Sequence, residues 1–565
     1  MKERAVTMSQ PHFDGLSAPS RPSAKSSGYV ETPPRVVRQL VDWAVKTSAS
    51  RVLDAGFGDG RFLKAVAERL KALGASPPAI AQQLYGVEID RAAYERTAGD
   101  LASHLGHAVE HLRCADFALA PPWTVDAVVG NPPYVRRQHL ENLSLWAGLS
   151  TVRLSALTDL SALFVMQATQ LLEPGGRLAV IVSGGWLDEE YGREFRNFLS
   201  REYAEIQVVG YTGRVFPDVL VRPVAIMATK GERVRGVGIE LRVLDGEAKS
   251  PSVEPRRLIT ADEFQGDAGT LSSKLYHPSG VKLLDRYGLS ASTLGDTASV
   301  RIGFQSFAKG FYLLSSNRVS QLGLAQDYLR PIVLSPRWLP DKLHLRKAEV
   351  PGRAFWAKNL ESLDEPGKCY LEAAEREPIG VRGKGYEVQG YQEAPRLKKA
   401  RRTPWFNIVT ELESRGGREI LIPRRTFVRY QVMDNADRIP ATEDFLEVSP
   451  CCSEFKAPLL VYLNSTFGEV AVRLASHQYG GGVYNLNPSQ ARAIRIPAIE
   501  RLTVKADLVS VWDRIKEVPF RDARPLLDDL VPQMLDLPLD ALEVAGHVLH
   551  DLHGAAKLLA RPSAS

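Results

Sequence analysis

The clearest chemical signal in this chain is one four-residue turn, Asn131-Pro132-Pro133-Tyr134, which follows the apolar run 125–129. The run is rich in β-branched residues and predicts a buried strand, and the prolines must end it because they lack an N–H and fix φ. The turn presents the Asn131 amide, a rigid backbone carbonyl at Pro132 and the Tyr134 ring. Two carbonyl oxygens can accept both N–H bonds of an exocyclic amine while an aromatic ring stacks on the planar group that carries it. The turn is therefore either a simple loop or a site for an amine on a planar ring, and the rest of the chain has to distinguish the two.

A second ligand-binding pattern lies earlier in the chain. A short strand at 52–55 is followed by glycines at 56, 58 and 60 and by a helix that reaches about residue 73. Glycines let the backbone approach a ligand, and the helix N-terminus offers free N–H groups. The spacing matches neither the Lys-bearing phosphate loop nor a complete G-x-G-x-x-G fingerprint. The next strand ends in carboxylates, and Glu88 is placed to accept the hydroxyls of a ribose.

The remaining motifs fall where strands end. Ahead of the glycine loop, Thr32 stands at the N-cap position of a helix with two prolines in its first turn. Strands that alternate with helices give a parallel sheet with right-handed crossovers. The strand tips near Asp54, Glu88, Asp116 and Asn131 should therefore meet at one edge of the sheet, where one ligand can touch them all.

Composition sets the broad class. With 565 residues, of which 44% are hydrophobic and 24% charged, the chain should form two or more globular domains. Its formal net charge of +5 fits an anionic partner. Its four cysteines show neither paired metal spacing nor a disulfide framework, which favours a reducing cytoplasm and predicts no metal site. No apolar stretch is long enough to span a bilayer, so we expect a cytoplasmic protein without a membrane segment.

The order of the motifs resembles that of the γ-class DNA adenine-N6 methyltransferases, the TaqI-like and Eco57I-like group of restriction–modification or related defence systems. The match runs from residue 29 to about residue 230. It includes Glu31-Thr32-Pro33-Pro34, the glycine loop, Val87-Glu88-Ile89-Asp90, Asp116-Phe117, Asn131-Pro132-Pro133-Tyr134, the segments 159–164, 173–182 and 185–187, and Arg214-Val215-Phe216-Pro217. The resemblance implies an α/β, class I Rossmann-like domain with a mixed seven-stranded sheet that binds S-adenosylmethionine. It also implies site-specific methylation of an adenine flipped out of double-stranded DNA.

The resemblance also assigns roles to residues. The cofactor would be bound by Thr32, Asp54, Gly56, Gly58, Glu88, Ile89, Asp116 and Phe117. The catalytic residues would be Asn131, Pro132, Pro133 and Tyr134, and the flipped adenine would lie between the rings of Tyr134 and Phe216. Flipping costs a few kcal/mol, and each aromatic stack returns about 1–3 kcal/mol.

We predict four segments. Residues 1–27 should be a disordered lead-in, 28–235 the methyltransferase domain, 236–500 a mostly β or mixed target-recognition domain, and 501–565 a helical segment. Between residues 396 and 429, basic side chains are interleaved with aromatic ones, a combination suited to phosphates and bases. We expect DNA contacts from Lys398, Lys399, Arg401, Arg402, Trp405, Arg424 and Arg425.

Three other functions fit part of the sequence. Protein glutamine-N5 methyltransferases also use Asn-Pro-Pro-Tyr, but Thr32-Pro33-Pro34, Phe216 and the long C-terminal domain argue against them. A cytosine-N4 DNA methyltransferase would use the same amine chemistry, although that group more often has Ser in place of Asn131. An inactive DNA-binding specificity module would keep the fold and lose the cofactor. The sequence has no nuclease pattern, so we expect a monomeric methyltransferase whose cognate restriction endonuclease is encoded separately.

Overall fold

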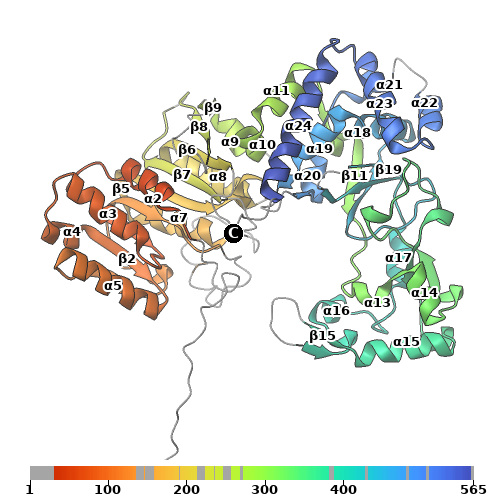
Figure 1. Cartoon of the computed structure of the whole chain (residues 1–565), viewed down its shortest axis with the longest axis horizontal. Coiled ribbons are helices and arrows are strands. Elements are labelled where there is room, and N and C mark those ends of the chain that lie inside the picture. The colour runs from red at the N-terminus through yellow and green to blue at the C-terminus, as the bar shows by residue number, and fades with distance from the viewer. Residues whose placement is uncertain are drawn as a thin grey trace, which may run out of the picture.

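The computed structural model describes residues 31–134, 146, 158–189, 191–212, 223–234, 236–245, 256–266, 271–380, 387–426, 430–478, 483–503 and 508–560. The lead-in predicted at 1–27 lies outside the described residues. The N-terminal part is built on one large sheet, and the C-terminal part on several smaller sheets and many helices (Figure 1). Within the described ranges, no helix is long and apolar enough to cross a membrane.

The large sheet has nine strands in the order β3-β2-β1-β4-β5-β7-β6-β8-β9. The strands from β3 to β5 are parallel, and β7 runs antiparallel to both of its neighbours. The register pairs Asp54 with Gly86 on one side and Val129 on the other, so the tips of these three strands are level, as the sequence predicted. The strands are β1 Val52–Ala55, β2 Leu84–Glu88, β3 His111–Cys114, β4 Val125–Gly130, β5 Leu172–Ser183, β6 Tyr203–Thr212, β7 Pro223–Lys230, β8 Ile239–Asp245 and β9 Arg257–Ile259.

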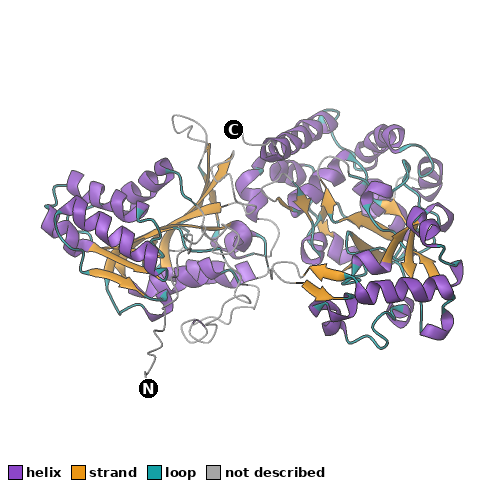
Figure 2. Cartoon of the chain, turned by 60° about the horizontal axis from the view of Figure 1, so that its bottom comes forward, coloured by secondary structure: helices purple, strands orange, loops and turns teal. Residues whose placement is uncertain are grey.

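Helices cover both faces of this sheet (Figure 2). Successive strand residues point to opposite faces, and Leu178 and Ala179 accordingly belong to different cores. One face carries α2 Pro34–Ala44, α3 Arg61–Ala72, α4 Pro77–Gln83 and α5 Arg91–Leu105. The other carries α7 Leu160–Leu171, α8 Tyr191–Glu202, α9 Ala261–Gln265 and α10 Leu271–Tyr276.

Two of the predicted domain boundaries fall inside folded units. Strands β8 and β9 continue the sheet beyond residue 235, and Ile239, Ile259 and Phe264 are buried in the same core as β5 and β7. The boundary at 235 and the seven-stranded sheet are therefore wrong, because the sheet needs β8 and β9 to complete that core. The boundary at 500 falls within α21 Ile499–Thr503, and the helices that follow it share one core with the central helices of the C-terminal part.

The C-terminal part combines a four-stranded antiparallel sheet, in the order β11-β20-β17-β19, with a helical layer. Its strands are β10 Ser292–Thr293, β11 Ala298–Ile302, β12 Leu313–Ser315, β13 Leu329–Pro331, β14 Gly352–Phe355, β15 Pro378–Gly380, β16 Glu387–Gln389, β17 Ile420–Pro423, β18 Arg425–Thr426, β19 Met433–Asp434, β20 Phe445–Pro450, β21 His477–Gln478, β22 Tyr484–Asn485 and β23 Arg495–Ile496. Its remaining helices are α11 Pro278–Arg286, α12 Leu294–Thr297, α13 Lys309–Tyr312, α14 Ser316–Leu322, α15 Glu365–Arg376, α16 Pro395–Ala400, α17 Val409–Arg415, α18 Lys456–Leu463, α19 Thr466–Ala475, α20 Pro488–Arg492, α22 Leu508–Ile515, α23 Phe520–Met534 and α24 Ala541–Ala560.

A buried ionic network joins three of these helices. Glu469 on α19 accepts hydrogen bonds from Arg473 at 2.7 and 2.9 Å and from Arg524 on α23 at 2.9 Å. His553 on α24 lies 3.2 Å from the same carboxylate. Burial opposes ionisation of Glu469, but the contact with His553 and the charges of Arg473 and Arg524 outweigh it and lower its pKa to about 2. The C-terminal helix is therefore fastened to the domain through charge.

Replacing Glu469 with Gln should lower the free energy of unfolding by roughly 3 kcal/mol at neutral pH, because the change leaves buried cations without their anion. Since the carboxyl pKa is about 2 in the folded protein against an ordinary 4.5, its stabilisation is complete above pH 4.5 and is lost as the pH falls toward 2. Denaturant unfolding of both proteins between pH 3 and 7 measures this. The difference in unfolding free energy between the intact protein and Glu469→Gln should narrow below pH 4.5. The control Glu543→Gln changes an exposed side chain and should have the same stability profile against pH as the intact protein. A difference in unfolding free energy that stays constant from pH 3 to 7 would contradict the lowered pKa of Glu469.

Candidate active site

The predicted Asn-Pro-Pro-Tyr turn begins where β4 ends, at the carboxyl edge of the sheet. Gly130, the last residue of β4, has φ +148°, and a Cβ on it would lie 2.6 Å from Asp54 Oδ1. Only glycine lets β4 approach the tip of β1 so closely. The next residue, Asn131, donates from Nδ2 to Thr32 Oγ1 at 3.0 Å. This bond fixes the orientation of the Asn131 amide.

Thr32 therefore acts differently from the simple helix cap predicted by its position. Helix α2 starts at Pro34 with Pro33 at the N-cap position and has no side-chain cap, while the Thr32 side chain is buried against Asn131. The Thr32 carbonyl accepts a hydrogen bond from Arg61 Nη1 at 2.5 Å, and Arg61 opens the helix that follows the glycine loop. Sequence reasoning missed Arg61, although its place as the first residue of that helix makes it a candidate. The two contacts hold residue 32 between the Asn-Pro-Pro-Tyr turn and the glycine loop.

The glycine loop is fastened to β2 by Glu88. Its carboxylate accepts the Gly58 N–H at 2.8 Å and the Asp90 N–H at 2.8 Å. Gly56, Gly58 and Gly60 all have positive φ, which lets the loop fold back over the strand tips. The structure therefore brings Gly58 and Glu88, which were both predicted to bind the cofactor, into direct contact.

Asp54, at the tip of β1, is the most unusual group of the site. Its side chain is buried, and neither carboxyl oxygen has a hydrogen-bond partner among the described residues. Burial raises the pKa of Asp54 well above its usual range, and the negative charges of Glu88 and Asp59 add to the shift. A buried carboxyl that lacks partners fits a position that faces a polar ligand.

Two apolar side chains stand exposed beside these polar groups. Ile89 follows β2 and is 67% exposed, and Leu119 follows β3 and is 60% exposed. Exposed apolar side chains at a ligand-binding edge suit a flat, apolar ring face. Sequence reasoning missed Leu119 because a single leucine after a strand carries no motif. Asp116 and Phe117, which were predicted to bind the cofactor, precede Leu119 in the same 3-10 helix turn. Asp116 caps this short helix, and Phe117 is buried against Phe164.

Tyr134 is half-buried beside the core of the α2 face. Its hydroxyl is buried without a hydrogen-bond partner in the described part of the chain. Burial, together with the negative charge of Asp159, raises its pKa well above the usual range, so the phenol stays neutral. The predicted partner ring, Phe216, lies outside the described residues.

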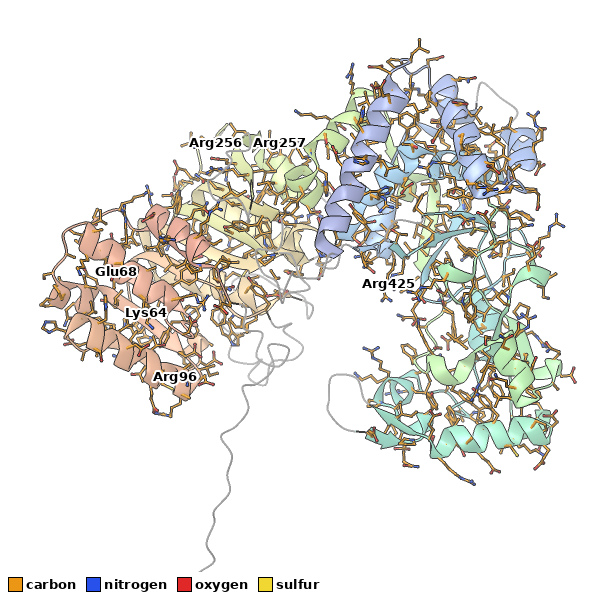
Figure 3. The ribbon with its side chains drawn as sticks, viewed as in Figure 1. Lys64, Glu68, Arg96, Arg256, Arg257 and Arg425 are labelled. Carbon is orange, nitrogen blue, oxygen red and sulfur yellow. The ribbon has the colours of Figure 1, made fainter. Side chains whose placement is uncertain are left out.

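The predicted DNA-binding residues divide into two groups. Lys398, Lys399, Arg401 and Arg425 are exposed, and the last is labelled in Figure 3. Two of the four make surface ion pairs, Lys398 with Glu393 at 2.5 Å and Arg425 with Asp444 at 3.7 Å. The other three are engaged by the protein: Arg402 pairs with Glu411 at 2.7 Å with its side chain 6% exposed, Arg424 donates to two backbone carbonyls, and Trp405 donates to Glu375 at 2.8 Å. These contacts argue against the predicted DNA contacts of Arg402, Arg424 and Trp405.

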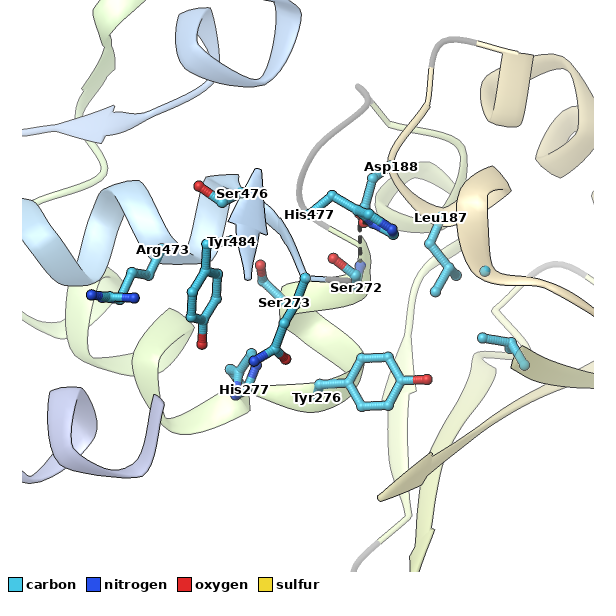
Figure 4. Close-up of a pocket in the computed structure, with 13 residues that line it drawn as sticks. Leu187, Asp188, Ser272, Ser273, Tyr276, His277, Arg473, Ser476, His477 and Tyr484 are labelled. Carbon is cyan, nitrogen blue, oxygen red and sulfur yellow. Dashed lines mark hydrogen bonds and ion pairs between the residues drawn. The ribbon is translucent and has the colours of Figure 1, made fainter. Parts of the chain in front are cut away.

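The two parts of the chain meet beside the carboxyl end of β5. Asp188 follows the 3-10 helix Gly184–Leu187 and lies 3.1 Å from the Nδ1 of His477 in β21 (Figure 4). The other oxygen of Asp188 accepts the backbone N–H of Ser272 at 3.3 Å, and the Ser273 hydroxyl donates to the Leu474 carbonyl. The hairpin β21–β22 is therefore anchored next to the carboxyl edge of the large sheet.

The strand order, the antiparallel β7 and the glycine loop define a class I methyltransferase fold. Two family descriptions match the sequence: "Eco57I restriction-modification methylase" over residues 124–216 and "Type II methyltransferase M.Eco57I, C-terminal domain" over residues 275–531. The chain belongs to the γ-class, Eco57I-like methyltransferases of restriction–modification systems. It is thus a DNA methyltransferase of the restriction–modification type.

Relatives agree with this assignment. The type II methyltransferase M.XamI of Xanthomonas campestris pv. amaranthicola is 26% identical over 85% of this chain and 86% of its own length. M.TthHB8I of Thermus thermophilus is 32% identical over 42% of this chain and 52% of its own. The solved structure of the type IIL restriction-modification enzyme MmeI in complex with DNA matches with a TM-score of 0.51 at 11% identity, and covers 92% of this chain and 75% of that one. This last similarity concerns the fold.

The contact between Thr32 and Asn131 predicts a kinetic signature. Thr32→Val keeps the shape of the side chain and removes the acceptor, so the Asn131 amide loses its fixed orientation. We expect kcat for methyl transfer to fall about fivefold, the value of one hydrogen bond, with the KM for the methyl donor unchanged. Initial rates with a labelled donor measure both, and Thr32→Ser should restore kcat. A raised donor KM at constant kcat would instead assign Thr32 to donor binding.

Proposed function

We propose that this chain transfers a methyl group from S-adenosylmethionine to the N6 amino group of an adenine flipped out of double-stranded DNA. The observation that carries the proposal is the Asn131–Thr32 hydrogen bond at the carboxyl end of β4, which presents the Asn131 amide beside the rigid Pro132 carbonyl. An amide oxygen and a backbone carbonyl are the acceptor pair that an exocyclic amine needs.

The strand tips fit the proposed cofactor. Asp54 offers a buried carboxyl without partners in the described residues, which suits a polar or cationic group. Glu88, held at the glycine loop, is placed for ribose hydroxyls, and the exposed Ile89 and Leu119 suit the faces of an adenine ring. When bound, S-adenosylmethionine supplies an electrophilic methyl group.

The residues of the turn act on the target amine. Asn131 Oδ1 and the Pro132 carbonyl accept its two N–H bonds, which draws the nitrogen toward a tetrahedral shape and frees its lone pair from the ring. Because both acceptors are fixed before the substrate arrives, they act mainly through orientation and electrostatics. Tyr134 remains a neutral phenol and so contributes its ring face rather than a base. A stack on that ring is worth about 1–3 kcal/mol, which offsets part of the cost of flipping.

The assignment to restriction–modification methyltransferases removes support from the protein glutamine alternative. Cytosine-N4 methylation uses the same acceptor pair and differs only in the base that carries the amine. The product base, rather than the catalytic geometry, distinguishes the two reactions.

Variants of the turn test the roles of its residues. Asn131→Ala should bind S-adenosylmethionine with nearly normal affinity and lower kcat for methyl transfer to DNA by about 10²–10³-fold, because it removes a fixed acceptor. Tyr134→Ala should likewise spare cofactor binding and lose transfer. Titration calorimetry and tritiated-methyl transfer measure the two quantities.

The matched control is Tyr134→Phe, which keeps the ring and removes a hydroxyl that makes no hydrogen bond within the described residues. It should keep near-normal activity. Full activity of Asn131→Ala would sink the role given to the turn, and an inactive Tyr134→Phe would refute the role of Tyr134 as a stacking face.

A further inference from the structure

One exposed aromatic ring in the C-terminal part has a backbone conformation that its residue type disfavours. Phe307 has φ +63°, in the left-handed region, and is 41% exposed. A Cβ-bearing residue reaches this region at a cost, and a bulky apolar one gains no local hydrogen bond from its side chain in return. Such conformations persist where the surroundings impose them, and they cluster at sites that bind ligands.

The surroundings of Phe307 hold it from both sides. The backbone of Phe304 bonds to Ala441 and Glu443 at 2.6 and 3.0 Å, which pins the loop before it. After it, the Ala308 carbonyl accepts the first backbone N–H bonds of α13. Exposure alternates along this loop: Ser306 and Ala308 are buried, and Phe307 between them is exposed. The loop thus presents the ring outward.

The guanidinium of Arg402 packs against the Phe307 ring. It lies 5.6 Å from the centre of that ring and donates to the Ser306 carbonyl at 2.9 Å. The same guanidinium lies 5.2 Å from the Tyr312 ring and pairs with Glu411. Arg402 therefore fixes the Phe307 ring and the carbonyl beside it, which explains why this arginine is engaged by the protein.

A continuous series of contacts connects this loop with the carboxyl edge of the large sheet, where the Asn131 turn lies. Lys309, two residues after the ring, and Arg425 of β18 both pair with Asp444, at 3.4 and 3.7 Å. Strand β18 belongs to the small sheet β18-β22-β21, whose residue His477 is paired with Asp188 next to β5. Figure 3 shows Arg425 on the side of the C-terminal part that faces the methyltransferase sheet.

The two cations next to the ring are paired with carboxylates. Lys309 lies 3.2 Å from Glu443 and 3.4 Å from Asp444, and Arg425 lies 3.7 Å from Asp444. The face of the Phe307 ring can contribute to DNA binding without any contact to a phosphate. Proteins that bind DNA insert phenylalanine between base steps or stack it on bases.

We propose that Phe307 is a DNA-contacting wedge of the recognition domain, which stacks on a base or between two base pairs of the bound duplex. The proposal rests on the chain acting on DNA, and not on adenine being its target. Arg402 is the positioning residue that fixes the ring for this contact. The strained backbone and the exposed ring are then accounted for by the same contact.

Filter binding to the restriction fragments of a plasmid tests the proposal at several salt concentrations, and the most tightly retained fragment carries the recognition sequence. Phe307→Gly should weaken binding of that fragment about 5- to 100-fold, the range of one lost stack. The slope of log affinity against log salt should stay unchanged, since a stacked ring releases no counterions. The melting temperature should be equal or higher, because glycine accepts a φ of +63° freely.

Two controls accompany the variant. Phe307→Tyr keeps the ring and should bind normally. Trp338→Ala removes another exposed aromatic ring, 46% exposed, from a segment that continues to Asp341 next to the start of α23, and should leave binding unchanged. Unchanged binding by Phe307→Gly overturns the proposal, and so does a shallower salt slope, which would indicate phosphate contact. A lower melting temperature with normal binding would make the ring a structural one.

Discussion

The hydrogen bond between Asn131 and Thr32 is the constraint on which the site depends, because it joins residues that are 99 positions apart. It requires β4 to end next to β1, which the parallel order of the sheet provides. It also requires Gly130, since a side chain there would collide with Asp54. The Asn131 amide is therefore oriented before any substrate binds, and a catalyst that works through fixed acceptors needs this preorganisation.

In the C-terminal part, a second set of fixed contacts holds the hairpin β21–β22. Arg473 packs 4.8 Å from the ring centre of Tyr484 in β22 and is held by the buried Glu469 network. Since β22 pairs with β21, and β21 meets Asp188, the terminal helices support the hairpin beside the active site. Helix α24 thus belongs to the same folded unit as this hairpin, and its distance in sequence from the turn at Asn131 conceals the connection.

The sequence located the motifs better than it located the domain boundaries. The glycine loop and the turn at Asn131 lie at the strand tips where the sequence placed them, because such motifs depend on local geometry. The boundary at 235 failed because β8 looks like a linker strand until its pairing with β6 is known. The DNA contact predicted for Arg402 was unreliable for a related reason. A basic residue among aromatic ones can bind phosphate or support a ring, and only its burial distinguishes the two.

Modification-sensitive sequencing of genomic DNA, from cells that express either the intact protein or Asn131→Ala, identifies the methylated base directly. We expect N6-methyladenine at one short sequence motif with the intact protein and none with the variant. N4-methylcytosine at such a motif would contradict the choice of base, and DNA with no modified base would contradict the assignment of this turn to DNA methylation.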